Sequence, residues 1–87
     1  MATTKLLDFW APWCGPCRIM DPILEEVEKE MGDKLEIVKI NVDEDPTTAS
    51  KYGVMSIPTY IIEKEGKESG RKVGSMPKAE LVKLISA

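Results

Sequence analysis

The sequence predicts a small α/β domain in which four strands and three helices follow one another in the order βαβαββα. Three observations lead to this prediction. Short apolar runs rich in β-branched residues indicate strands, and one long stretch repeats its apolar residues at the spacing of a helix. Glycine, proline and aspartate separate these segments, as they do at turns and helix ends. The 87 residues suit one domain, residues 1–87, with a modest core.

The first half of the chain is predicted to form a strand, a helix and a second strand. Residues 5–10, KLLDFW, form the first strand, and residues from about 15 to 31 form the helix, which ends at a glycine C-cap, Gly32. The expected inward face of this helix consists of Ile19, Met20, Ile23, Leu24, Val27 and Met31. Residues 35–42, LEIVKINV, form the second strand, and such a crossover normally pairs its strands in parallel.

The second half is predicted to form a short helix, a hairpin and a closing helix. Asp45 followed by Pro46 is a good N-cap and first-turn pair for a helix that ends at Gly53. The stretch TYIIEKEGKESGRKVG predicts two antiparallel strands around Gly66. The last stretch, PKAELVKLISA, predicts a helix whose inward residues are Leu81, Val82, Leu84 and Ile85.

Composition and charge exclude several classes of function. A hydrophobic content of 43% with 31% charged residues is typical of a soluble globular domain. The formal charge of −3 argues against nucleic acid and anionic membranes as partners, because both need a basic surface. The N-terminal apolar run is too short for a signal peptide, and no window approaches a membrane span, so the expected compartment is the cytoplasm.

Both cysteines of the chain, Cys14 and Cys17, lie in the motif WCGPC. In a reducing compartment such a pair indicates redox chemistry or metal binding more than a permanent crosslink, and a loop this small gains only about 2 kcal/mol from closure. A closed zinc site needs about four ligands, whereas the chain has two cysteines and no histidine. A metal shared between two copies of the chain stays open as an alternative.

The spacing of the pair suits reversible disulfide chemistry. Residues three apart in a first helical turn have Cα atoms about 5 to 6 Å apart, which a disulfide accepts. Cys14 lies at the predicted helix N-terminus, which lowers a thiol pKa, so Cys14 is the candidate nucleophile. Cys17 is expected to be more shielded and to resolve the mixed disulfide. Gly15 leaves room for a partner's backbone, and Pro16 is tolerated in a first turn.

The stretch FWAPWCGPC resembles the active-site signature of the thioredoxin family, and KINVDEDP, YGVMSIPT and KVG follow in that family's order. The resemblance implies a thioredoxin fold with a four-stranded mixed sheet in the order 2-1-3-4, flanked by three helices. Longer members carry an additional strand and helix before the strand that starts near Lys5. The chain therefore resembles a short thioredoxin that lacks these two elements, with residues 35–42 as an uncovered edge of the sheet.

Two charged residues interrupt predicted strands. Alternation places Asp8 on the same side of its strand as Leu6 and Trp10, although an exposed strand end would also explain a charge there. The resemblance implies that Asp8 is buried, accepts the proton of the resolving cysteine, and has a pKa raised by desolvation. It also implies that Lys39 lies near Asp8, while a solvated lysine is the alternative.

Four further residues are candidates for a groove that binds an extended peptide. Trp13, beside the nucleophile, is expected to form exposed apolar surface, whereas Trp10 packs beside the site. Pro58 would by itself be an ordinary strand-edge residue, but the resemblance implies a cis proline that faces the cysteines. Ile57 and Gly74 would then line the groove through backbone contacts.

The resemblance implies a dithiol-disulfide oxidoreductase that reduces disulfides of partner proteins without a cofactor. A separate reductase would supply the electrons, flavin-dependent or linked to glutathione. A disulfide oxidase or isomerase, a non-catalytic binding module and a metal-bridged dimer remain alternatives. The chain is expected to be mainly a monomer, with weak dimerisation through residues 35–42 as a hypothesis.

Overall fold

A four-stranded mixed sheet organises the fold. The computed structural model describes residues 4–87; the predicted domain bounds also include residues 1–3, which lie outside the described part. The strands are β1 (Thr4–Trp10), β2 (Leu35–Asn41), β3 (Thr59–Lys64) and β4 (Lys67–Val73). They lie in the order β2-β1-β3-β4, with β1 and β2 parallel and the other pairs antiparallel. The predicted order 2-1-3-4 is confirmed.

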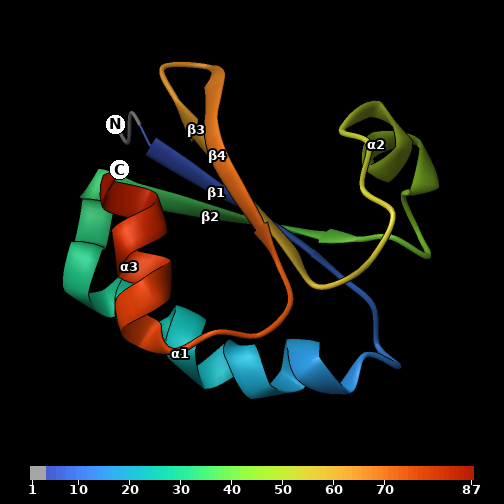
Figure 1. The fold of residues 1–87 in the computed structure, drawn as a ribbon, viewed down its shortest axis with the longest axis horizontal. Helices are drawn as coiled ribbons and strands as arrows, with labels where there is room; N and C mark the ends of the chain where they lie inside the picture. Colours follow the sequence, from blue (N-terminus) through green and yellow to red (C-terminus); the bar gives the residue numbers. More distant parts are fainter. Residues whose placement is uncertain (1–3) are drawn as a thin grey trace.

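In residues 4–87, three α-helices flank this sheet. They are α1 (Gly15–Met31), α2 (Pro46–Lys51) and α3 (Lys78–Ser86), and the short 3₁₀ helix η1 (Gly32–Lys34), which the sequence did not predict, follows α1. Figure 1 shows α1 and α3 next to each other, whereas α2 lies at the opposite end of the view. The predicted element order is confirmed.

The two faces of the sheet carry separate hydrophobic clusters. On the face covered by α1 and α3, the buried residues are Leu6, Met20, Leu24, Val27, Leu35, Tyr60, Ile62, Met76, Leu81 and Ile85. On the face covered by α2, they are Leu7, Phe9, Ala49 and Ile61. We call these the α1 face and the α2 face. Because side chains alternate along each strand, the same strands supply both clusters.

The helix α1 buries a narrower stripe than the sequence predicts. Met20, Leu24 and Val27 are buried, and Ile23 and Met31 are half-buried against the same cluster. Ile19 was predicted to face inward, and this is wrong, because its side chain is 64% exposed. One residue corresponds to about 100° around a helix, so a neighbour of Met20 points away from the stripe.

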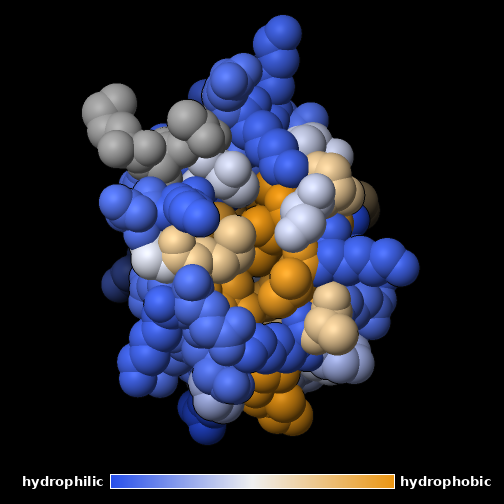
Figure 2. All heavy atoms as spheres, turned by 90° about the vertical axis from the view of Figure 1, so that its left-hand side faces the viewer, coloured by the Kyte–Doolittle hydropathy of each residue, from blue (hydrophilic) through white to orange (hydrophobic). Residues whose placement is uncertain are grey.

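The surface near α1 and α3 carries both apolar and hydrophilic side chains. Apolar residues that are only partly buried, such as Ile23, Val82 and Leu84, flank the cluster of the α1 face. Figure 2 shows, on the side that is at the left in Figure 1, hydrophobic atoms set among hydrophilic side chains. In residues 4–87, no helix is both long enough and apolar enough to cross a bilayer.

Caps and turns fix most of the predicted boundaries. Gly32 caps α1, and its N–H donates to the carbonyl oxygen of Glu28. The side chain of Asp45 caps α2 by accepting from the N–H of Thr48, as predicted. The hairpin turns at Glu65 and Gly66, whose φ values of 54° and 83° lie in the left-handed region.

Several boundaries differ from the prediction by one or two residues, as at the start of β1, which is Thr4 and not Lys5. The second strand ends at Asn41, one residue early, because the side chain of Asn41 accepts from the N–H groups of Asp43 and Glu44 and starts a turn. The helix α2 ends at Lys51, and Gly53 follows as a turn residue with φ of 67°.

Candidate active site

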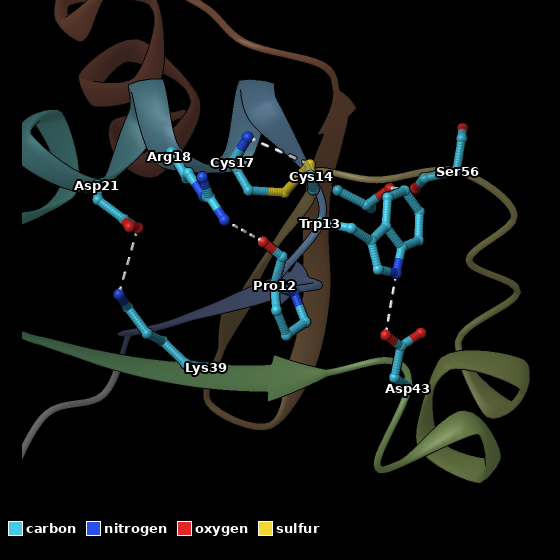
Figure 3. The surroundings of a disulfide bond; sticks show 10 residues. Pro12, Trp13, Cys14, Cys17, Arg18, Asp21, Lys39, Asp43 and Ser56 are labelled. Carbon is cyan, nitrogen blue, oxygen red and sulfur yellow. Dashed lines mark hydrogen bonds and ion pairs between the residues drawn. A yellow bond between two sulfur atoms is a disulfide. The ribbon is translucent and has the colours of Figure 1, made fainter.

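The two cysteines lie at the junction between β1 and α1. Cys14 is the N-cap of α1 in an extended conformation, and Cys17 lies in the first turn. The two form a disulfide with their Cα atoms 5.3 Å apart, inside the range that the spacing predicted. The backbone N–H of Cys17 donates to Sγ of Cys14 at 3.2 Å, as Figure 3 shows. A first-turn amide thus already points at the sulfur that would carry a thiolate.

Local hydrogen bonds shape the turn before α1. The N–H of Cys14 donates to the carbonyl oxygen of Ala11 at 3.1 Å. The guanidinium of Arg18 reaches back and donates to the carbonyl oxygen of Pro12 at 2.7 Å (Figure 3). Gly15 and Pro16 are exposed, and no atom comes within 4 Å of the place where a Cβ of Gly15 would lie. The turn is therefore braced from inside and open on its outer side.

Both cysteines are buried. Cys14 is 3% exposed and Cys17 is 5% exposed, so both are buried alike in the disulfide form, and the greater shielding predicted for Cys17 is not seen. Both pack in a small cluster with Ala11, against which Trp10 and Ile57 also lie. The apolar contacts of Cys14 with the turn and the neighbouring loop account for its burial.

Trp13 is 68% exposed, as predicted. Its indole N–H donates to Oδ2 of Asp43 at 2.9 Å, which holds the ring beside the disulfide (Figure 3). Asp43 was not predicted as a site residue. Its only signal in the sequence was its position in the motif KINVDEDP.

The loop before β3 faces the cysteine turn. The Ile57–Pro58 peptide bond is cis, as the resemblance implied, and the N–H of Gly74 donates to the carbonyl oxygen of Pro58 at 2.8 Å. Pro58 is buried, whereas Ile57 and Gly74 are half-buried. A cavity of about 450 Å³ lies between this loop and Trp13; it is lined by Trp13, Val42, Ala49, Val54, Met55, Ser56 and Ile57. Val54 and Met55 were not singled out from the sequence.

Asp8 is buried on the α1 face with 2% of its surface exposed. Burial raises its pKa to about 6, while the charge of Lys39 lowers the pKa and the charge of Asp21 raises it. Within residues 4–87, Oδ1 of Asp8 has no hydrogen-bond partner. The sequence expectation of a buried aspartate with a raised pKa is therefore confirmed.

Lys39 lies opposite Asp8 in the parallel pairing of β2 with β1. Its ammonium, however, contacts Oδ1 of Asp21 at 3.4 Å, and both side chains of that ion pair are 49% exposed. Lys39 is thus a neighbour of Asp8, as the resemblance implied, and half solvated, as the alternative held. Asp21 was not predicted, because the sequence gives no local sign that its side chain meets β2.

The comparisons with known proteins agree with this geometry. The thioredoxin family model matches residues 1–87 of the chain. The chain belongs to the thioredoxin family. Thioredoxin of Bacillus subtilis is 58% identical over 81 residues, which are 93% of this chain and 78% of that protein. The chloroplastic M-type thioredoxin of Chlamydomonas reinhardtii is 51% identical over 80 residues, 92% of this chain and 57% of that protein.

Among solved structures, a single-site mutant of a thioredoxin from Halobacterium salinarum has a TM-score of 0.89 and 36% identity to this chain. The match covers 98% of this chain and 74% of that one. Together with the Cys14–Cys17 disulfide, this membership makes the chain a thiol-disulfide oxidoreductase of the thioredoxin family. Its redox centre is the CGPC sequence at the start of α1.

Proposed function

We propose that this thioredoxin works as a reductant: its reduced cysteine pair transfers two electrons to a disulfide of a partner protein. The observation that carries the proposal is the position of Cys14 at the N-cap of α1, with the N–H of Cys17 directed at its sulfur. That amide and the helix dipole stabilise a thiolate on Cys14. The thiolate attacks the partner's disulfide and forms a mixed disulfide, and one partner sulfur leaves as a thiolate.

Cys17 completes the reaction in this proposal. Its thiol gives its proton to the carboxylate of Asp8, and the resulting thiolate attacks the sulfur of Cys14. The Cys14–Cys17 bond forms, the mixed disulfide breaks, and the second partner sulfur leaves reduced. Asp8 suits the role of proton acceptor because its pKa of about 6 is nearer to neutral pH than that of an ordinary aspartate. Lys39 modulates this pKa through its charge.

The exposed surface around the disulfide would bind the partner. Trp13, Gly15 and Pro16 present the open side of the cysteine turn. Ile57, Pro58 and Gly74 lie in the two loops that a backbone hydrogen bond joins, and an extended peptide would lie along them. No cofactor takes part in these steps, because the sulfur atoms themselves carry the electrons.

The partners and the setting follow from the proposed direction. Substrates are proteins with accessible disulfides, and a separate reductase, flavin-dependent or glutathione-linked, returns electrons to the pair. We place the protein in the cytoplasm and regard residues 1–87 as one domain. We also propose that it is mainly monomeric, with weak association along β2, which is an edge strand of the described sheet. Sedimentation that detects only monomer at high concentration would refute the association.

The proposed direction is tested by the reduction potential of the Cys14–Cys17 pair. The protein is equilibrated in glutathione buffers, the thiols are trapped, and the reduced fraction is measured. A potential well below that of the glutathione couple supports a reductant. A potential well above it would mean that the pair oxidises its partners.

Two variants test the order of attack. With a partner protein that contains a disulfide, Cys17→Ser should accumulate the mixed disulfide on Cys14. Cys14→Ser should form none and lose the reductase activity. Full biological activity of Cys14→Ser would instead identify a binding module that does not use redox chemistry.

A further inference from the structure

Three polar residues form a row across the sheet beneath the redox centre. In the strand register, Asp8 of β1 pairs with Lys39 of β2 on one side and with Tyr60 of β3 on the other. Directly paired residues of neighbouring strands point to the same face, so all three lie on the α1 face. Lys39 is at the edge and half exposed, whereas Asp8 and Tyr60 are buried.

The helix α1 adds a second carboxylate to this row. Asp21 lies four residues after Cys17, on the same side of α1. Its Oδ1 atom contacts the ammonium of Lys39 at 3.4 Å, and Figure 3 shows the two side chains pointing toward each other from α1 and β2. The ammonium of Lys39 therefore bonds to the outer carboxylate, while Oδ1 of the inner carboxylate, Asp8, is left without a partner among the described residues.

We infer that Asp21 is a positioning residue for the redox reaction: it holds the ammonium of Lys39 at the edge of the sheet and so withholds it from Asp8. The inference rests on the proposed role of Asp8 as the proton acceptor of Cys17. The side chain of Asp21 points toward Lys39 and lies apart from the two sulfur atoms (Figure 3). It acts through Lys39 on the carboxylate that takes the proton.

The electrostatic consequence has one direction. An ammonium close to Asp8 would favour the ionised carboxylate, and a second carboxylate nearby disfavours it. Asp21 therefore raises the pKa of Asp8 in two ways, by its own charge and by drawing Lys39 away. The titratable groups that face Asp8 are Lys39 of β2, Tyr60 of β3 and Asp21 of α1; of these, the charge of Lys39 lowers its pKa and that of Asp21 raises it.

For the reaction, the pKa of Asp8 determines how readily Cys17 transfers its proton. When Cys17 gives up its proton, Asp8 changes from a carboxylate to a carboxylic acid, and Cys17 becomes the thiolate that attacks Cys14. A higher pKa of Asp8 makes this transfer more favourable but reduces the fraction of Asp8 that is ionised in acid. Asp21 thus makes Asp8 a stronger proton acceptor, but in acid it slows the resolution of the mixed disulfide by Cys17.

The test is a titration of Asp8 in the oxidised protein, where the two cysteines are joined and do not titrate. The chemical shift of the Asp8 carboxyl carbon is followed by NMR in the wild-type protein and in Asp21→Asn, Asp21→Glu and Lys39→Gln. We expect the midpoint to move to lower pH in Asp21→Asn, to higher pH in Lys39→Gln, and to stay near the wild-type value in Asp21→Glu. An unchanged or higher midpoint in Asp21→Asn would overturn the inference.

The double variant separates the two ways in which Asp21 acts. If Asp21 works by positioning Lys39, the shift caused by Asp21→Asn becomes smaller in the Lys39→Gln background. An equal shift in both backgrounds would show that Asp21 acts by its own charge alone, and the positioning role would be wrong. Glu68→Gln is the matched control, because it removes a similarly exposed ion pair with Arg71 on β4 and should leave the Asp8 midpoint unchanged.

This titration does not depend on the proposed function, since it needs no partner protein. The function of Asp8 is tested separately by the rate at which Cys17 resolves a mixed disulfide on Cys14, which Asp8→Asn should slow. Below the wild-type pKa of Asp8, Asp21→Asn should resolve faster than the wild-type protein. A titration that shifts as expected, with no change in Asp8→Asn kinetics, would disprove the role of Asp8 and leave the role of Asp21 in setting its pKa intact.

Discussion

The two faces of the sheet bury different chemistry, although the same strands supply both. The α2 face packs Leu7, Phe9 and Ile61 against Ala49 of α2. In the described residues, three buried side-chain atoms have no hydrogen-bond partner: Oδ1 of Asp8, Nε1 of Trp10 and the hydroxyl of Tyr60. Alternation along β1 and the register of β3 place all three on the α1 face. The face next to Cys17 thus carries unsatisfied polar groups, and the other face does not carry these.

This difference has a consequence for the stability of the two faces. Burial of apolar side chains stabilises the fold in proportion to the area removed from water. Burial of an unpaired polar group costs free energy that must be offset elsewhere. Apolar side chains on both faces therefore stabilise the sheet, but the α1 face also loses stability because it buries Asp8, a carboxylate with a raised pKa.

The largest effect is expected on the α2 face. Phe9 is fully buried, and its ring lies 5.7 Å from that of Tyr52. Phe9→Ala should lower the free energy of unfolding by about 3–5 kcal/mol, because it removes a large apolar side chain and leaves a cavity. Urea unfolding of the oxidised protein at pH 5 and pH 8 should give a similar loss at both. If the alanine variant does not fold, Phe9→Leu should show a smaller loss that is also independent of pH; a strong dependence on pH would contradict the comparison.

The second prediction concerns Asp8, where the substitution should stabilise the protein at pH 8 and not destabilise it. Its pKa of about 6 in the folded chain lies above the value of about 3.9 for an unfolded chain, so the native state binds the proton more tightly. Stability should therefore be greatest below about pH 4 and fall as the pH rises to about 6, by about 3 kcal/mol in total. Asp8→Asn should remove this fall, so that the variant is more stable than wild type at pH 8 and similar at pH 4.

Urea unfolding across this pH range checks the prediction, and Asp45 provides a control of opposite sign. Hydrogen bonds from Thr48 lower the pKa of Asp45, so this carboxylate stabilises the protein above its unfolded pKa. Asp45→Asn should therefore destabilise the protein at pH 8. The role assigned to burial would be refuted if the free energy of unfolding of the wild-type protein did not fall between pH 4 and pH 6 relative to that of Asp8→Asn.

The same contrast explains which features the sequence could predict. The cysteine pair and the cap at Asp45 follow from local patterns of residues close in the chain, and the strand order follows from the family resemblance of the quoted motifs. The contact of Asp21 with Lys39 joins residues that are 18 positions apart on two elements, and no local pattern marks it. The inward orientation predicted for Ile19 is wrong for a related reason: an apolar residue beside a helical stripe faces the core only if a neighbouring element covers it.

The smallest of the three effects is expected at Tyr60. Its side chain is fully buried on the α1 face, and within residues 4–87 its hydroxyl has no hydrogen-bond partner. Burial and the charges of Asp8 and Asp21 raise its pKa, so the hydroxyl stays neutral. Tyr60→Phe keeps the ring and removes only the unsatisfied oxygen, which should stabilise the protein by about 1 kcal/mol.

Thermal unfolding of Tyr60→Phe and of Tyr60→Leu tests this account. The leucine variant also removes the hydroxyl, but it leaves part of the ring volume empty and should be less stable than the phenylalanine variant. If Tyr60→Phe is instead clearly destabilised, the hydroxyl has a partner in solution, and the α1 face then carries one unsatisfied group fewer. In that case, the pKa of Asp8 in Tyr60→Phe is measured by the same carboxyl titration. A shifted midpoint would mean that the partner of the Tyr60 hydroxyl is linked to Asp8. An unchanged midpoint would mean that Asp8 destabilises this face independently of Tyr60.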